Sequence, residues 1–490
     1  KSKIKPDMII TDPKSELYAL TAIYLEKQGY EVRVLDFIHL KFMDTLNCLE
    51  FTTTEKEIIE MGEGYVKSVG GAQIAGRGSV DSFWDDAESQ LLSALIGYVL
   101  QVMPKDQQTF TTVAQLLSSD NVSNPDKARY FFVKSGVTGA ALQLWNNFLM
   151  AEDRVRANIL IGLATKLRLF AVSGIQNITN NTTLDISKIG AKKDKPMAVF
   201  IFMPDGDRTF SPIINVVVTT ILKQLYKTAY LYANALYNPV YFILEEMANI
   251  GKITGLSEML GTMRGRKIYP MMVWQSLSQM KQRYPDAWED ILSMCDTHIY
   301  LGVNDEFTSK YASNSIGDTT INIQGLSRNY DGVFGVNKKS ESQHYQSRKL
   351  MQPEEIKRLD NKKMIISQRS HYPVMLNKVQ YKFWKGGCKI CDTKDIFSLP
   401  LMKSVNDSVN LPDVDVIGTD KSQLRQPNKN KQLDRLKRDE FVLPEYSLNS
   451  KDILAEKFNI GIDDIGDADV MFTIDDIDNG SKPKDISFEK

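Results

Sequence analysis

The stretch VYFILEEMANIG, residues 240–251, decides the fold class. Its first five residues are apolar on both faces and the next two are glutamates, so it predicts a buried strand that ends in an acid pair. Strands buried on both faces and separated by helices predict an α/β fold, with a mostly parallel sheet flanked by helices. Six further apolar runs of this kind alternate with longer helical patterns: residues 7–11, 31–35, 198–203, 269–274, 298–303 and 363–367.

The acid pair suggests a chemistry. Glu245 and Glu246 follow the strand at its carboxyl end, where ligands bind in open α/β sheets, and Asp12 and Asp36 end two other predicted strands in the same way. In proteins that hydrolyse nucleotides this is the Walker B arrangement. The first acid orients the magnesium shell and the second polarises the attacking water. The alternative is a buried strand whose acids merely reach a solvent-exposed loop.

The next two elements add polar candidates. Residues 258–266 predict a helix that ends in Arg264 and Arg266, and the following strand leads to Gln275. An amide beside the acids is suited to sensing the γ-phosphate or holding the water, and an arginine past a helix end is suited to acting as an arginine finger on a neighbouring subunit's nucleotide. The alternatives are a capped strand end and cations that favour a helix C-terminus.

The pattern of predicted strands and helices changes along the chain. Strand patterns are scarce between residue 83 and about residue 186, where four stretches are helical: 84–103, 111–118, 126–135 and 140–172. After residue 402 the apolar periodicity is lost, and a basic stretch is followed by an acidic end. This composition predicts a mobile, flexible C-terminal tail. We therefore expect a nucleotide-binding domain in two parts (1–82 and 191–402), an inserted all-α domain (83–190) and a charged tail (403–490) that binds cargo or a partner.

Composition narrows the class of protein less than the motifs do. Of the 490 residues, 42% are hydrophobic and 25% are charged, with 60 lysines and arginines against 61 acids, so net charge argues neither for nor against nucleic acid. Four cysteines in so long a chain favour a reducing cytoplasm. Cys388 and Cys391 form only half of a zinc-site pattern, so we expect no structural metal.

Ten short segments of the chain resemble, in order over residues 6–385, the TraG-type coupling proteins of type IV secretion and conjugation. They are TDPKSELY (11–18), GYEVRVLD (29–36), FWDDAE (83–88), FMPD (202–205), FILEEMANIG (242–251), RGR (264–266), VWQSLSQM (273–280), DEFT (305–308), IGDTT (316–320) and LMQPEEI (350–356).

The resemblance implies a RecA-like nucleotide-binding domain with an inserted all-α domain, ATP and Mg²⁺ as cofactors, and a homo-hexameric ring on the cytoplasmic face of the bacterial cell membrane. It also implies ATP-driven delivery of DNA–relaxase complexes, or of effector proteins, to the secretion channel. Asp12 and Lys14, in the first segment, become candidates for nucleotide binding. Glu245 becomes the candidate for binding Mg²⁺ with the nucleotide.

Two departures from that family qualify these expectations. The sequence contains no Gly-x-x-x-x-Gly-Lys-Ser/Thr phosphate loop, which in the family lies just upstream of the segment matching residues 6–18. We therefore expect the loop and the N-terminal membrane helices to precede this chain, and the chain alone to be inactive as an ATPase. Glu245 also stands where the family usually has aspartate, which leaves open which acid is the base.

Two other functions are compatible with the sequence. One is a receptor or scaffold that selects cargo without hydrolysing ATP, and the other is a DNA-pumping ATPase of the FtsK/HerA group. The FWDDAE segment and the size of the predicted helical insertion favour the coupling protein over the DNA pump.

Overall fold

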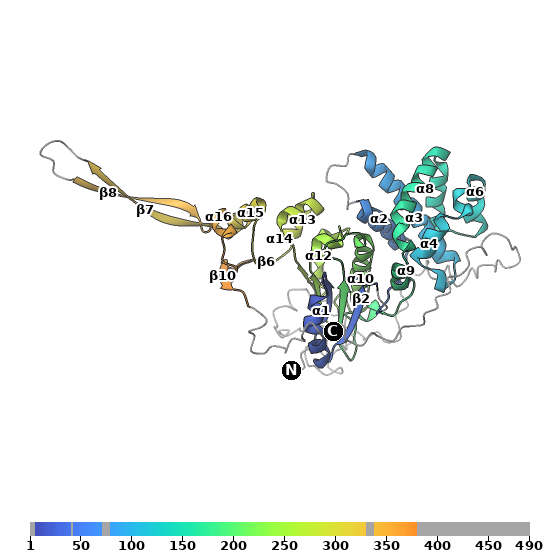
Figure 1. The fold of residues 1–490 in the computed structure, drawn as a ribbon, viewed down its shortest axis with the longest axis horizontal. Coiled ribbons are helices and arrows are strands. Elements are labelled where there is room, and N and C mark those ends of the chain that lie inside the picture. The colour runs from blue at the N-terminus through green and yellow to red at the C-terminus, as the bar shows by residue number, and fades with distance from the viewer. Residues whose placement is uncertain (1–4, 41–42, 71–78, 330–337, 380–490) are drawn as a thin grey trace, which may run out of the picture.

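A five-stranded sheet, parallel throughout, lies at the centre of the computed structural model, which describes residues 5–40, 43–70, 79–329 and 338–379 (Figure 1). The strands run in the order β2-β3-β1-β4-β5. This arrangement confirms the predicted α/β fold with a parallel sheet. The bounds are β1 (Asp7–Asp12), β2 (Glu31–Asp36), β3 (Met197–Phe202), β4 (Val240–Leu244) and β5 (Ile268–Met272).

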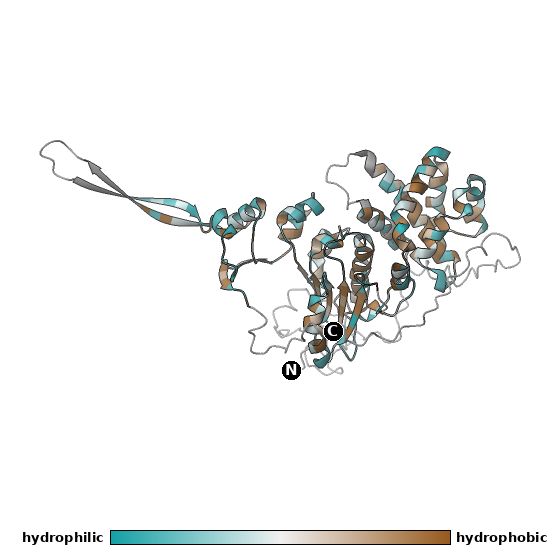
Figure 2. Ribbon diagram, in the orientation of Figure 1, coloured by the Kyte–Doolittle hydropathy of each residue, from teal (hydrophilic) through white to brown (hydrophobic). Residues whose placement is uncertain are grey.

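Different helices cover the two faces of this sheet, because side chains alternate along each strand. Ile10 of β1 packs towards α1 (Glu16–Lys27), whereas Ile9 belongs to the larger core shared with α10 (Ser211–Leu231) and α12 (Leu256–Met263). In Figure 2 the central strands are brown, in keeping with burial on both faces.

A run of helices separates β2 from β3 in the sequence. The long α3 packs against α2, α7 and α8, and the predicted boundary between residues 82 and 83 falls inside it. The helices are α2 (Glu55–Gly70), α3 (Ser79–Val102), α4 (Phe110–Leu117), α5 (Asp120–Ser123), α6 (Pro125–Lys134), α7 (Gly139–Met150), α8 (Asp153–Leu167) and α9 (Ser173–Thr179). Short 3-10 turns are η1 (Cys48–Phe51), η2 (Lys105–Gln107), η3 (Arg168–Ala171) and η4 (Ile186–Lys188).

The FWDDAE segment has a structural role in these helices. Lys166 of α8 forms ion pairs with both Asp85, at 2.6 Å, and Glu88 of α3, and all three side chains are largely buried. A buried lysine is tolerated only when acids pair with it. Two of the three acids of the segment therefore join α3 to α8.

A second sheet follows α13 (Leu277–Arg283) and α14 (Trp288–Ser293). It is antiparallel, in the order β10-β9-β6, and α15 (Glu306–Ile316) and α16 (Pro353–Lys357) cover the face that carries Tyr300 and Ile365. Its strands are β6 (Thr297–Tyr300), β9 (Lys363–Gln368) and β10 (Val374–Asn377). Between α15 and α16 a two-stranded ribbon, β7 (Asp318–Asn329) and β8 (Lys338–Lys349), projects away from the sheets (Figure 1).

All seven predicted strands overlap observed ones, whereas β7, β8 and β10 were not predicted. The predicted tail and the pair Cys388 and Cys391 lie outside the described residues. Within the described ranges, no single helix has both the length and the apolar character needed to cross a membrane. The bent pair Asp153–Ala171 and Ser173–Thr179, with an angle of 82° between its helices, passes the same test by length and composition only.

Candidate functional site

Two acids meet at the carboxyl edge of the central sheet because β1 and β4 are parallel neighbours. The register pairs Thr11 with Leu244, so Asp12 and Glu245 are the next residues on adjacent strands. The Thr11 hydroxyl donates a hydrogen bond to the main-chain oxygen of Glu245 at 2.8 Å. This bond fixes the point at which the chain leaves the sheet with its acid pair.

The surroundings of Glu245 raise the pKa of its carboxyl group. Burial is the first cause that raises the pKa of Glu245 above its ordinary value, and the carboxylates of Glu246 and Asp12 add to it. A raised pKa means that the ionised form is disfavoured in this environment. A bound cation would reverse this effect, and carboxylate oxygens are suitable ligands for Mg²⁺.

Glu246 occupies a tight turn. Its backbone is left-handed, with φ at 51°, a conformation that costs a non-glycine residue about 1 kcal/mol or more. The next residue, Met247, donates its N–H to the main-chain oxygen of Val273 at 3.0 Å, so the end of β5 holds the turn in place. Strained residues that the surrounding structure holds in place are common at functional sites.

Gln275 lies beyond the carboxyl end of β5, on the strand next to β4. The structure therefore brings it to the same edge as Glu245 and Glu246. Its side chain is exposed, and its Oε1 accepts a hydrogen bond from Nε2 of Gln279 at 2.9 Å. The Nε2 group of such an amide can donate to a ligand oxygen or to a water.

Asp12 faces its own chain. Its carboxylate accepts the backbone N–H of Tyr18 at 2.8 Å and thereby caps the turn that leads into α1. Burial raises the pKa of Asp12, and backbone hydrogen bonds from Tyr18, Leu17, Lys14 and Glu16 oppose that rise. Lys14 is exposed and lies 3.5 Å from Asp205, from Nζ to Oδ2. Asp12 therefore supports the site by its charge, while Lys14 lies on the outer surface of the same edge. Asp36 is different, because its carboxylate closes a local turn with His39 at the end of β2.

A polar network that sequence reasoning missed holds α11 (Met247–Ile250), the turn after the acids. Arg283 donates to the main-chain oxygen of Ala248 at 2.8 Å, and Arg208 donates to Oδ1 of Asn249 at 3.1 Å. Ser211 donates to the main-chain oxygen of Asn249 at 2.6 Å. Arg208 and Ser211 come from one part of the chain and Arg283 from another, and their spacing in the sequence carries no signal.

Arg264 and Arg266 lie at the opposite edge of the sheet. They precede β5, whereas Gln275 follows it, and a strand of five residues separates the two edges by about 17 Å. The structure therefore does not bring either arginine to the acids of the same chain. Any contact with a nucleotide requires the nucleotide of a neighbouring copy.

The two arginines differ in their freedom to make such a contact. The Arg264 side chain is 80% exposed, and its Nη1 lies 3.9 Å from Oδ2 of Asp296. The guanidinium of Arg266 lies over the rings of Tyr226 and Tyr230, 4.7 and 5.5 Å from their centroids. Arg266 is therefore a packing residue, and Arg264 is the one that faces outward.

The residues present fit one half of a nucleotide site. Oxygen ligands suited to Mg²⁺ gather at Glu245 and Glu246, whereas no Gly-x-x-x-x-Gly-Lys-Ser/Thr cradle for phosphate occurs in the sequence. The described residues hold no cluster of three or more His, Cys, Asp or Glu side chains that is suited to a metal ion bound by protein alone. A magnesium ion here would arrive with its nucleotide.

Comparison with curated proteins finds VirD4 and TraG proteins as relatives. The chain is 30% identical over 143 residues to "Protein VirD4" of Agrobacterium fabrum, which covers 29% of this chain and 21% of that protein. It is 25% identical over 216 residues to "Protein VirD4" of Rhizobium radiobacter, covering 44% and 30%. It is 22% identical over 402 residues to the "Probable conjugal transfer protein TraG" of Sinorhizobium fredii, covering 78% and 59%. The chain thus spans less than a third of the length of the two VirD4 proteins.

Solved structures share the fold. The unbound conjugative coupling protein TrwBdeltaN70 matches with a TM-score of 0.55 and 12% identity, over 76% of this chain and 78% of that one. TrwB in complex with ADP and Mg²⁺ matches with the same TM-score, identity and coverage. These likenesses confirm the RecA-like fold.

The family model described as "Type IV secretory system Conjugative DNA transfer" matches residues 3–409, most of the chain. This match agrees with the order of the ten segments, the parallel sheet and the acid pair at its carboxyl edge. The chain belongs to the type IV secretory system conjugative DNA transfer family.

Proposed function

We propose that this chain is the cytoplasmic part of a type IV secretion coupling protein. In the complete protein it couples ATP hydrolysis to the delivery of DNA–relaxase complexes, or of effector proteins, into the secretion channel. The observation that carries the proposal is the acid pair Glu245 and Glu246, which leaves a central strand beside Asp12 and turns towards Gln275. The ADP and Mg²⁺ of one TrwB complex, and the non-hydrolysable ATP analogue of another, support the choice of cofactors.

Each residue of the edge has a proposed role. Mg²⁺ with ATP supplies charge neutralisation and polarises the phosphate. Glu245, on the side of Asp12, orients the water shell of the ion. Glu246 accepts the proton of the attacking water, and Gln275 holds that water or the γ-phosphate.

The phosphate loop is proposed to enter between β5 and β6. At their amino ends Arg264 lies 3.9 Å from Asp296, and at their carboxyl ends Ser278 donates to the Asp305 carboxylate at 2.9 Å. The two strands thus run side by side in the same direction, yet the described residues contain no hydrogen-bonded ladder between them. A strand inserted there would join the two sheets and end at the same edge as Glu245, with β5 between them.

Exposed apolar side chains support this placement. Tyr269 and Met271 of β5, with Ile299 and Leu301 in and after β6, are between 39% and 54% exposed. Large apolar side chains gathered at a strand edge mark a surface that another element covers. We propose that the covering element is the phosphate-loop strand and its helix, supplied by residues upstream of this chain.

We also propose the domain division and the assembly that the sequence predicts. We keep the division into residues 1–82 and 191–402 (nucleotide-binding), 83–190 (all-α) and 403–490 (tail). We propose a homo-hexameric ring at the cytoplasmic membrane face, anchored by upstream helices. Family membership supports this proposal, and the exposed Arg264 at the outer edge suits contact with a neighbour. A receptor that does not hydrolyse ATP is the second candidate, favoured by the missing phosphate-loop motif.

The test is plasmid transfer from a donor strain that expresses the complete protein. Replacing the native gene with the Glu246→Gln variant should abolish transfer, because an amide cannot accept the proton of water. The matched control is Glu258→Gln, an exposed glutamate on α12, which should transfer normally. Normal transfer by Glu246→Gln would favour the receptor and exclude the role proposed for this acid.

A further inference from the structure

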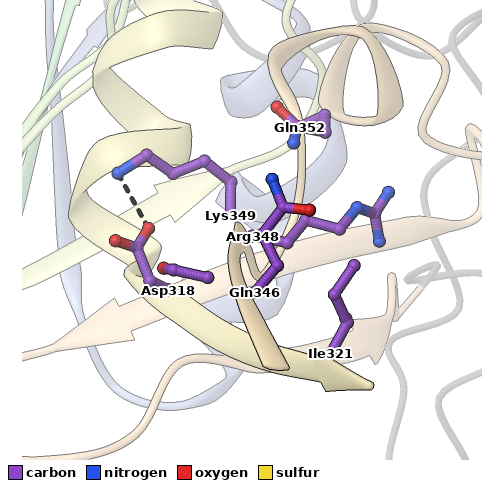
Figure 3. A pocket seen from close by; sticks show the side chains of 7 residues that line it. Asp318, Ile321, Gln346, Arg348, Lys349 and Gln352 are labelled. Atoms are coloured by element: carbon purple, nitrogen blue, oxygen red, sulfur yellow. Dashed lines mark ion pairs between the residues drawn. The ribbon is translucent and has the colours of Figure 1, made fainter. Parts of the chain in front are cut away.

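The pocket at the base of the β7–β8 ribbon has its charges paired. Its volume is about 460 Å³, and Figure 3 shows the ion pair between Lys349 and Asp318, at 2.8 Å, among its lining side chains. Arg348, which also lines it, pairs with Glu355 of α16 at 2.5 Å. Each of these two cations is matched by an acid, so the pair of them gives the pocket no excess charge with which to select a ligand.

The first turn of α13 offers a stronger candidate, because it follows β5 at the same edge of the sheet as the acid pair. Its backbone is fixed in place. Ser276 caps the helix by accepting the N–H of Gln279 at 3.2 Å. The N–H of Leu277 donates to Oγ1 of Thr308 at 2.9 Å, in a buried bond. The side chains of Gln275 and Gln279 therefore stand on a backbone that other elements hold.

Gln279 does not complete the usual helix cap. At the third position of a helix that begins after a serine, a glutamine side chain commonly reaches back to the backbone N–H of that serine. In this helix the Nε2 group of Gln279 reaches one residue further back and donates to Oε1 of Gln275 at 2.9 Å. The glutamine thus holds a neighbouring side chain in place of a capping bond.

Burial determines which way round the two amides lie. Among the described residues, Oε1 of Gln279 is a buried atom that has no hydrogen-bond partner. If the Gln279 amide were turned over, Nε2 with its two N–H groups would take that buried place, and buried N–H groups without an acceptor are rarer than buried oxygens without a donor. The Gln279 amide therefore keeps its Nε2 towards Gln275, and Oε1 of Gln275 is fixed as the acceptor.

This arrangement sets the chemical character of Gln275. Its Oε1 is engaged by Gln279, and the described residues give its Nε2 no hydrogen bond. A donor is suited to the negatively charged oxygens of a γ-phosphate, whereas an amide oxygen would repel them. An exposed glutamine without such a bond samples many rotamers and presents either end of its amide. The bond from Gln279 removes that freedom.

We propose that Gln279 is a positioning residue for ATP hydrolysis, which holds the Gln275 amide so that its Nε2 is the group available to the γ-phosphate. This inference rests on the proposed function, in which Gln275 holds either the attacking water or the γ-phosphate, and it narrows that choice to the phosphate. Gln279 acts only through Gln275.

The test measures steady-state ATP hydrolysis by the complete protein, which includes the upstream residues. Gln279→Leu should lower kcat about tenfold or more and leave KM for ATP within about twofold, because Gln275 loses its orientation while the other groups that bind ATP remain. The melting temperature should not fall, since leucine replaces a buried oxygen that has no partner. When Gln275→Ala is already present, Gln279→Leu should lower kcat no further.

Gln279→Glu tests the direction of the bond. An ionised carboxylate cannot donate to Oε1 of Gln275, so kcat should fall at neutral pH. As the pH is lowered, kcat relative to that of the unaltered protein should recover, because a protonated carboxyl group donates again. The matched controls are Gln282→Leu and Gln282→Glu, at an exposed glutamine of the same helix. Both should keep the unaltered kcat at every pH.

Three results would each overturn the inference: an unchanged kcat in Gln279→Leu, losses that multiply in the double variant with Gln275→Ala, or a loss in Gln279→Glu that does not vary with pH. All three are compatible with the proposed function, which Glu246→Gln tests separately. A complete protein that hydrolyses no ATP would instead overturn the proposed function, and the inference with it.

Discussion

The hydroxyl of Thr11 donates a 2.8 Å hydrogen bond to the main-chain oxygen of Glu245, which ties the end of β1 to the first of the two acids. Thr11 is fully buried, so the bond is shielded from water. A buried threonine at this position orients the backbone on which the acid pair stands, although it has no chemical role of its own.

Thr11→Val should therefore destabilise the chain. Valine keeps the shape and removes the donor, which leaves a buried carbonyl without its partner at a cost of about 1 to 3 kcal/mol. Urea unfolding followed by circular dichroism measures the change. Thr165→Val, at an exposed helical threonine, is the control and should change stability by less than about 0.5 kcal/mol. Equal effects in the two variants would show that the Thr11 bond contributes nothing particular.

How much of this site follows from the sequence depends on how each residue is held. Glu245, Glu246 and Gln275 follow apolar strands, and parallel neighbours bring strand ends together, so their meeting was predictable. Arg208 and Arg283 were not, because each reaches α11 from a different part of the chain and hydrogen-bonds to a backbone or amide oxygen. A single arginine in a loop gives no periodic signal.

The strands also divide into those that the sequence predicts and those that it does not. The seven predicted strands are runs of apolar residues, whereas the residues of β7 and β8 are mostly polar and β10 is exposed throughout. An exposed ribbon has no hydrophobic alternation to detect. The predicted boundary between residues 82 and 83 falls inside α3, because α3 begins before its apolar stretch does.

Glu245→Gln should raise the melting temperature at neutral pH. Burial and the nearby Glu246 and Asp12 raise the pKa of Glu245 in the folded state. The folded state then binds more protons than the unfolded state in the window above the ordinary glutamate pKa, so stability falls as pH rises through it. The variant's advantage should be present at pH 7 and vanish below about pH 4, near the unfolded pKa. Scanning calorimetry at both pH values measures it, and an equal difference at the two would contradict the assignment.

The 490-residue chain should hydrolyse ATP negligibly. It lacks the backbone cradle and the lysine that bind the β- and γ-phosphates. A longer chain that includes the upstream residues should restore turnover. Phosphate release by the two proteins at equal concentration is the measurement. Robust magnesium-dependent hydrolysis by the shorter chain would mean that its phosphates are bound by other residues.

Deleting residues 463–490 should reduce capture of a cargo or accessory protein in a pull-down without changing the melting temperature. The seven aspartates between residues 463 and 478 suit a basic surface, and binding through exposed charge should weaken steeply with salt. Loss of thermal stability with unchanged capture would instead show that these residues pack on the folded core.

Arg264→Ala and Arg266→Ala should fail in different ways. Arg264 is exposed and has one weak ion pair, so its alanine variant should fold normally yet hydrolyse ATP slowly in the assembled complete protein, as the loss of an arginine finger requires. Arg266 covers the rings of Tyr226 and Tyr230, so its alanine variant should lose about 1 to 2 kcal/mol of folding stability. Mixing Arg264→Ala with Glu246→Gln subunits supplies the control. Some interfaces then combine an intact Glu246 with an intact Arg264 from the neighbour, and turnover should partly recover. If Arg264→Ala keeps full activity in the assembled ring, or if mixing recovers none, Arg264 does not act across the interface.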